Sequence, residues 1–165
     1  MIIKSSLKSL FLVLLLSGCA AQPPAPETPE ARSSDLEVSE LAIVRAVEVS
    51  GEPGAYTFVV TIESEETGCG QYANWWEVVT EDGTLLYRRI LAHSHVDEQP
   101  FTRSGGPVAV EADQTVIVRS HMYPQGYSAQ VVQGTVSEGW VPTMLPTDFA
   151  LELAEAEPQP NGCAF

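Results

Sequence analysis

Lysine is nearly missing from this 165-residue sequence, since its two lysines, Lys4 and Lys8, stand at the very start. The whole chain has eight basic residues against 22 acidic ones, which gives a formal net charge of −14. Such an excess of carboxylates repels nucleic acid and anionic lipid across a Debye length of roughly 8–10 Å. The composition therefore argues against nucleic-acid binding and against electrostatic docking on a membrane, and it is typical of solubility in a salty medium.

The amino-terminal apolar run is too short to cross a bilayer, which takes about 20 apolar residues in a helix. This run, Leu10–Leu16, has seven residues. It follows the two lysines, and no acidic residue occurs before Glu27. The layout is that of a secretory signal, so we expect residues 1–18 to be removed on export.

The expected signal ends in a short motif made up of Leu16, Ser17, Gly18 and Cys19. This ending resembles the lipobox of bacterial lipoprotein precursors, in which leucine at minus three and two small residues precede a cysteine. The resemblance implies that Cys19 receives a diacylglyceryl group and that two or three acyl chains hold the mature protein in the lipid bilayer. Alanines at positions 20 and 21, where an aspartate would retain the protein at the inner membrane, imply the outer membrane of a Gram-negative cell envelope.

Cysteine is scarce as well, and the assignment of Cys19 to lipid leaves the pair Cys69 and Cys163. An even pair in an oxidising compartment most simply forms a disulfide. On the chain-entropy model, closing a loop of this length, about 94 residues, contributes about 4.7 kcal/mol. Two buried free thiols and a mixed disulfide with a partner are the alternatives, and the chain has no Cys-x-x-Cys motif for redox catalysis.

Composition divides the chain into three parts. Residues 20–36 contain four prolines and almost no apolar side chain to bury, which predicts a tether. We therefore expect a signal peptide at 1–18, a lipidated cysteine with its tether at 19–36, and one domain at 37–165. The domain is expected to carry a C-terminal extension from about residue 139.

Short β-branched and aromatic runs, separated by turn residues, fill the expected domain. The clearest run, Tyr56–Glu63, alternates between apolar and polar residues, as a half-buried strand does. We expect seven strands, at 41–49, 55–63, 72–80, 84–92, 107–111, 114–122 and 129–136. Seven strands in about 100 residues, with a tryptophan on the third, resemble an immunoglobulin-like or fibronectin type III-like sandwich. The predicted fold class is all-β, a single antiparallel β-sandwich whose C-terminal extension is tied back by the disulfide.

Two local signals give finer expectations. The Asp82-Gly83 pair suits the positive φ angles of a two-residue hairpin turn. Counting outward from it pairs Glu77 with Arg88, Trp76 with Arg89 and Val78 with Tyr87, which predicts a cross-strand ion pair and a cation–π contact. Farther on, a short helix is expected over 147–157, capped by Thr147 and stopped by Pro158.

The histidines offer one candidate for chemistry. On a strand, His93 and His95 would point the same way, and with Glu98 and Gly105 they resemble the first motif of the cupins. That resemblance implies a divalent metal held by His93, His95 and Glu98, with His121 as a third histidine, in a metal-binding protein or metalloenzyme. The chain places two residues between the second histidine and the glutamate, where cupins place three or four. The other interpretation is a polar loop without a cofactor.

Aromatic residues give the remaining candidates. Trp75 and Trp76 are adjacent and so point to opposite faces of a strand, which sends one into the core. The other tryptophan is expected either to lie against Arg88 or Arg89 or to be exposed at a binding surface. If the domain binds an envelope protein or a glycan, we expect the contacts at Trp75, Tyr123 and Tyr127 and in the strand-end loops 93–104 and 123–128. The chain shows no catalytic motif, so the sequence favours a membrane-anchored envelope lipoprotein whose domain binds or scaffolds without catalysis, with the cupin-like metalloprotein as the alternative.

Overall fold

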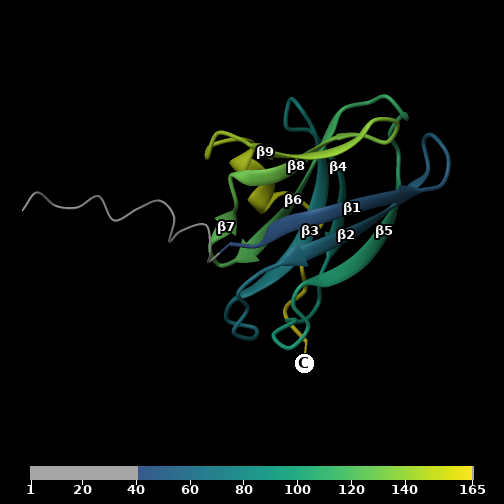
Figure 1. Ribbon diagram of the computed structural model, residues 1–165. Coiled ribbons are helices and arrows are strands. Elements are labelled where there is room, and N and C mark those ends of the chain that lie inside the picture. Colours follow the sequence, from purple (N-terminus) through teal and green to yellow (C-terminus); the bar gives the residue numbers. More distant parts are fainter. Residues whose placement is uncertain (1–40, 165) are drawn as a thin grey trace, which may run out of the picture. The chain divides into compact units, whose positions relative to one another are not determined.

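The computed structural model describes residues 41–164, which form a sandwich of two antiparallel sheets (Figure 1). The signal peptide, Cys19 and the tether lie outside the described residues. Among residues 41–164 no helix is long and apolar enough to cross a membrane. The elements, in chain order, are β1 (Ile43–Ser50), β2 (Tyr56–Glu63), β3 (Tyr72–Thr80), β4 (Leu85–Ile90), β5 (Phe101–Val108), β6 (Val116–Tyr123), β7 (Gly126–Tyr127), β8 (Gln130–Thr135), β9 (Gly139–Met144) and the short 3-10 helix η1 (Leu151–Glu155).

The order of the strands confirms the predicted fold class. The smaller sheet has the order β1-β2-β5, and the larger has the order β4-β3-β6-β8-β9, with β7 paired to β6. Strands β1, β2 and β5 thus take the A, B and E positions of an immunoglobulin-type sandwich, and β3, β6 and β8 take the C, F and G positions. Strand β4 extends the larger sheet beside β3.

The main core lies between the two sheets. Alternate residues of β2, namely Phe58, Val60 and Ile62, are fully buried there against Trp76 and Val78 of β3. This burial follows the period of two that the Tyr56–Glu63 pattern predicted. On β3 and β6, by contrast, seven or more consecutive residues are buried, so both faces of the larger sheet are covered.

The outer cover of the larger sheet is the C-terminal segment. Val79, Ile117 and Val131 form a second, smaller core there with Leu153 of η1. Figure 1 shows this segment, drawn in yellow, passing from β9 along the larger sheet. We call residues 145–164 the C-terminal strap.

Strand prediction was wrong at the sheet edges. Residues 41–164 form nine strands where seven were expected, because β7 and β9 were missed. The strand expected at 107–111 instead begins at Phe101 and ends at Val108. Both β5 and β9 are edge strands. Edge positions tolerate glycine and proline, which interrupt the sequence pattern of a strand.

The hairpin between β3 and β4 has the predicted pairing but a different turn. Glu77 faces Arg88, Trp76 faces Arg89 and Val78 faces Tyr87, as expected. The turn itself has three residues rather than two, since the amide of Thr80 donates to the carbonyl of Thr84 at 2.9 Å. A bulge between Val78 and Val79 then restores the register.

The helix expected over 147–157 is reduced to the five residues of η1. Ala150 precedes it in the left-handed region, with φ 47°, and no side-chain cap is formed by Ala150, which occupies the cap position. The carbonyls of Ala150 and Leu153 accept hydrogen bonds from the amides three residues ahead, as in a 3-10 helix, and also from Arg119 and Arg88. These tertiary contacts override the local helical preference.

Candidate functional site

The predicted disulfide is present. Cys69 and Cys163 are joined with an S–S distance of 1.99 Å and a Cα–Cα distance of 5.6 Å. The bond ties the end of the strap to the β2–β3 loop. Nearby, the amide of Ala164 donates to the carbonyl of Ala92 at 2.6 Å, which fixes the strap to the β4–β5 loop as well.

A buried charge centre lies on the outer face of the larger sheet. The side chain of Glu77 is fully buried and accepts hydrogen bonds from Arg88 at 2.7 and 2.9 Å and from Arg119 at 2.8 Å. The pairing of Glu77 with Arg88 was predicted from the turn. The second arginine was missed, because it comes from β6 and the pairing of β3 with β6 has no local sequence signal.

The same two arginines hold the strap. Arg88 donates to the carbonyls of Leu153, Ala156 and Pro158 at 2.5 to 3.1 Å. Arg119 donates to the carbonyls of residues 149 and 150, each at 2.9 Å. The donors of both arginines thus bind groups of the protein itself. This face of the larger sheet therefore has a structural role.

Trp75, expected to be exposed, belongs to this buried layer. Only 2% of it is exposed, Arg88 lies 4.3 Å over its ring, and His121 stacks on it at 3.9 Å. Tyr127 packs at the edge of Trp75 and under Arg119, and burial raises the pKa of Tyr127 to about 12. The expectation that Trp75 offers a binding surface is wrong, because Arg88, His121 and Tyr127 cover its ring, and the alternative of a contact with Arg88 is confirmed. Tyr123 remains exposed, at 48%.

The expected cation–π contact between Trp76 and Arg89 is replaced by two others. Trp76 faces the core and packs on Tyr87 with ring centroids 5.5 Å apart. Arg89, its cross-strand partner, projects from the same face of β4 and reaches the smaller sheet, where it donates to the carbonyl of Ser104 of β5 at 3.2 Å. The register is as expected, but the guanidinium binds this carbonyl instead of the tryptophan ring.

The histidines do not converge on a common point. His93 and His95 lie in the β4–β5 loop rather than on a strand, with ring centroids 4.6 Å apart. His121 lies on the outer face of β6, where its Nδ1 is 2.7 Å from Oδ1 of Asn74, and Glu98 is paired with Arg103 at 2.8 Å. Within residues 41–164 no three His, Cys, Asp or Glu side chains are arranged to hold a metal. The cupin-like ligand set is therefore not assembled, because His121 is stacked on Trp75 and bonded to Asn74, whereas His95 is stacked on Phe101.

His95 instead helps to close one end of the sandwich. Its ring stacks on the core residue Phe101 at 3.8 Å. Burial, with smaller effects of Arg103 and His93, lowers the pKa of His95 to about 4. Burial followed by Arg88 and Arg119 lowers the pKa of His121 to about 3.

The carboxylate of Glu66 is buried at this end of the sandwich as well. It accepts hydrogen bonds from the hydroxyl of Ser64 at 3.0 Å, from the amide of Ala73 at 3.2 Å and from the amide of His95. The side chain of Gln99 also links the loop after β2 to the loop after β4, because it accepts a hydrogen bond from the amide of Ser64 and donates one to the carbonyl of His95. The hydrogen bonds of Glu66 tie the loop after β2 to the start of β3 and to the β4–β5 loop.

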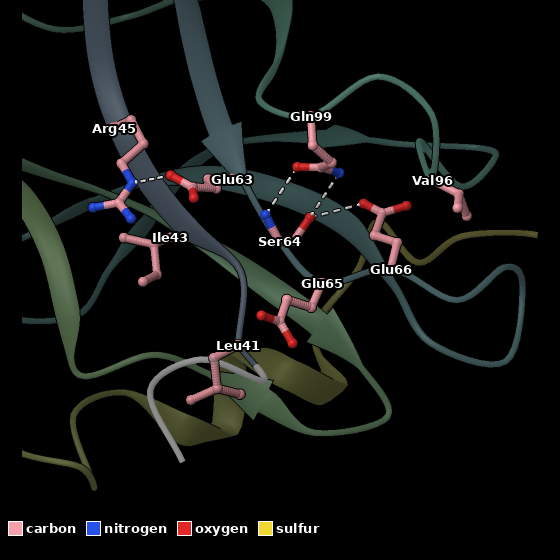
Figure 2. A pocket seen from close by; sticks show the side chains of 9 residues that line it. All are labelled: Leu41, Ile43, Arg45, Glu63, Ser64, Glu65, Glu66, Val96 and Gln99. Atoms are coloured by element: carbon pink, nitrogen blue, oxygen red, sulfur yellow. Dashed lines mark hydrogen bonds and ion pairs between the residues drawn. The ribbon is translucent and has the colours of Figure 1, made fainter. Parts of the chain in front are cut away.

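An open groove of about 410 Å³ runs past this cluster (Figure 2). Its volume lies within the range of small-ligand pockets, roughly 300–1,000 Å³. The start of β1 and the loops after β2 and β4 supply its lining, which consists of Leu41, Ile43, Arg45, Glu63, Ser64, Glu65, Glu66, Val96 and Gln99. Val96 and Gln99 belong to the 93–104 loop that was expected to contact a partner, whereas the other seven lining residues were not candidates from sequence. The run Glu63 to Glu66 was a visible polar signal, but only the placement of β1 beside it makes a groove.

Comparison with known proteins yields one relative to report. No family model matches the chain, and no solved structure matches it. A protein of the halophilic archaeon Halomicrobium mukohataei, named "Putative lipoprotein", is 35% identical over 108 residues, which cover 66% of this chain. The match covers 53% of that protein, so the chain spans about half the length of this curated relative.

Proposed function

We propose that the chain is a lipid-anchored protein of the cell envelope whose β-sandwich binds or scaffolds without catalysis. The similarity to the haloarchaeal protein carries the proposal, because the name of that protein agrees with the lipobox at Leu16 to Cys19. The signal peptide and the acyl chains on Cys19 are part of the proposal. For a Gram-negative host, Ala20 and Ala21 in place of an aspartate favour the outer membrane.

The arrangement of the domain supports a binding role at one end. β1 pairs through Ile43 with Glu63 at the end of β2, so the chain enters the domain at the end that carries the groove. Disulfide and strap stiffen that end through Cys69. A stiff frame that presents an open groove is suited to recognising a partner that diffuses in the envelope.

Exchange of the modified cysteine tests the anchor. In cells grown with labelled palmitate, Cys19→Ala should lose the label and move from the detergent phase to the aqueous phase, because its acyl chains are its only proposed attachment. The control is Ala21→Ser, which leaves the cysteine in place and should keep both label and phase. Fractionation of the membranes of a Gram-negative host reports the outer-membrane address in the same cells.

The thermal unfolding midpoint of Cys19→Ala should equal that of the parent, since Cys19 is not one of the cysteines joined in the sandwich. A variant that kept the label, or that lost its fold, would contradict the proposal.

A further inference from the structure

We propose that the groove binds a lysine side chain presented by an extended segment of an envelope protein. The inference rests on the proposed binding function and names the class of partner for it. Three features of the groove support it: its apolar walls, its charge and the composition of its lining.

The walls suit the stem of a long basic side chain. Leu41 and Ile43 at the start of β1 form one side, and Val96 in the β4–β5 loop lies on the other with 48% of its surface exposed (Figure 2). Lysine buries its four methylene groups along apolar surface while its ammonium group stays at a polar site. The opposed aliphatic walls provide that surface.

The charge of the groove is negative. Glu63 is neutralised by Arg45, whose Nε lies 2.5 Å from its carboxylate. Glu65 is exposed, and within residues 41–164 its carboxylate makes no ion pair or side-chain hydrogen bond. Glu66 lies beneath, its side chain fully buried, hydrogen-bonded by neutral donors and paired with no arginine of the described chain. Glu65 is thus the exposed carboxylate of this cluster whose charge has no partner among residues 41–164. A cation placed beside it would compensate that charge.

The domain as a whole carries the same sign. Residues 41–164 contain seventeen acidic residues and five arginines, a formal charge of −12. Each of those arginines is engaged, in an ion pair or in a hydrogen bond to a carbonyl. A field of one sign steers oppositely charged partners toward the surface and disfavours acidic ones.

The lining also argues for a peptide rather than a glycan. Sugar rings are commonly held against the faces of aromatic side chains, and none of the nine lining residues is aromatic. The groove offers aliphatic walls, the amide of Gln99 and carboxylates. These groups match a basic side chain.

The test uses the mature, lipidated protein, labelled with ¹⁵N, in micelles of a nonionic detergent. The probe is the capped tripeptide acetyl-Ala-Lys-Ala-amide, and its matched analogue has norleucine in place of lysine. Saturable shifts of the amides of Glu65, Val96 and Gln99 are expected with the lysine peptide at low salt and not with the analogue. Raising the salt should weaken binding, because Glu65 is exposed.

Two variants distinguish binding of the peptide in the groove from its general electrostatic attraction to the acidic domain. Glu65→Gln should weaken binding about three- to fivefold, as for loss of one exposed ion pair. Glu138→Gln makes the same change of charge in the β8–β9 turn at the other end of the sandwich and should leave the affinity unchanged.

Equal weakening by both variants, equal binding of the norleucine peptide, or saturable binding of a muropeptide in place of the lysine peptide would overturn the proposal. So would an absence of saturable shifts. None of these results bears on the palmitate experiment, so the proposal of a lipid anchor and the proposal of a lysine-binding groove are tested independently.

Discussion

At the scale of single residues, Glu77 is the side chain on which the outer face of the larger sheet depends. It is fully buried between Arg88 and Arg119, and both arginines also bind carbonyls of the strap. Removal of one member of a buried ion cluster leaves the others uncompensated, which costs about 3–5 kcal/mol. Glu77→Gln should therefore lower the free energy of unfolding by about that amount in urea titrations. Glu52→Gln, at an exposed position, should change it by less than about 0.5 kcal/mol; equal effects would refute the account.

The buried histidines make a second prediction at this scale. The pKa of His95 is lowered to about 4 and that of His121 to about 3, whereas both take a value near 6.5 in the unfolded chain. The unfolded chain thus binds more protons below pH 6.5, so stability is complete above that pH and is lost as the pH falls toward 4 and 3. Each histidine should contribute a slope of up to about 1.4 kcal/mol per pH unit.

Urea unfolding at pH 7, 6, 5 and 4 measures that slope. His121→Gln should reduce it, because the glutamine does not titrate. His93→Gln, at an exposed position, should leave it unchanged. A slope indifferent to His121 would show that carboxylates alone govern the acid response.

At the scale of elements, the strap is attached in two ways. Residues 149–158 are held by Leu153 in the outer core and by the arginine hydrogen bonds, whereas residues 159–164 are held mainly by the disulfide and one amide of Ala164. In the variant with both Cys69→Ser and Cys163→Ser, hydrogen exchange should become fast over 159–164 and stay slow over 149–157. Its free energy of unfolding should fall by about 2–5 kcal/mol. Fast exchange along the whole strap would show that the disulfide, not the arginines, holds it.

At the scale of the whole molecule, the negatively charged side chains of the described domain repel one another. Its charge of −12 is spread over carboxylates of which Glu63, Glu77 and Glu98 are paired with arginine. Salt screens such repulsion, so raising NaCl from 0.05 to 2 M should raise the unfolding midpoint by roughly 4–10 °C, the shift for about 1–2 kcal/mol. Changing five exposed acids to amides should flatten that dependence; the set is Glu52, Glu111, Asp113, Glu138 and Asp148. An unchanged salt response in that variant would contradict the repulsion argument.

Much of the fold could be predicted from local pattern. The alternation over Tyr56–Glu63, the turn at Asp82-Gly83 and the even pair of cysteines led to a strand, a hairpin register and a disulfide that the structure confirms. Each of these depends on neighbours in sequence or on simple counting. The lipid anchor at Cys19 comes from sequence as well and stays a prediction.

The site was decided by tertiary structure alone. The sequence groups His93, His95 and His121 as one candidate ligand set, but His121 is bonded to Asn74 on β3, whereas His95 packs on Phe101 from the β4–β5 loop. The face of a sheet that a side chain reaches depends on the register of its strand. Arg119 reaches Glu77 across 42 residues, and the groove forms only where β1 begins beside Glu63. Pairings between distant strands leave no local trace in the sequence. The sequence therefore determined the regular inner strands and the side chains available, and the packing of two sheets and a strap determined the edge strands and which residues meet.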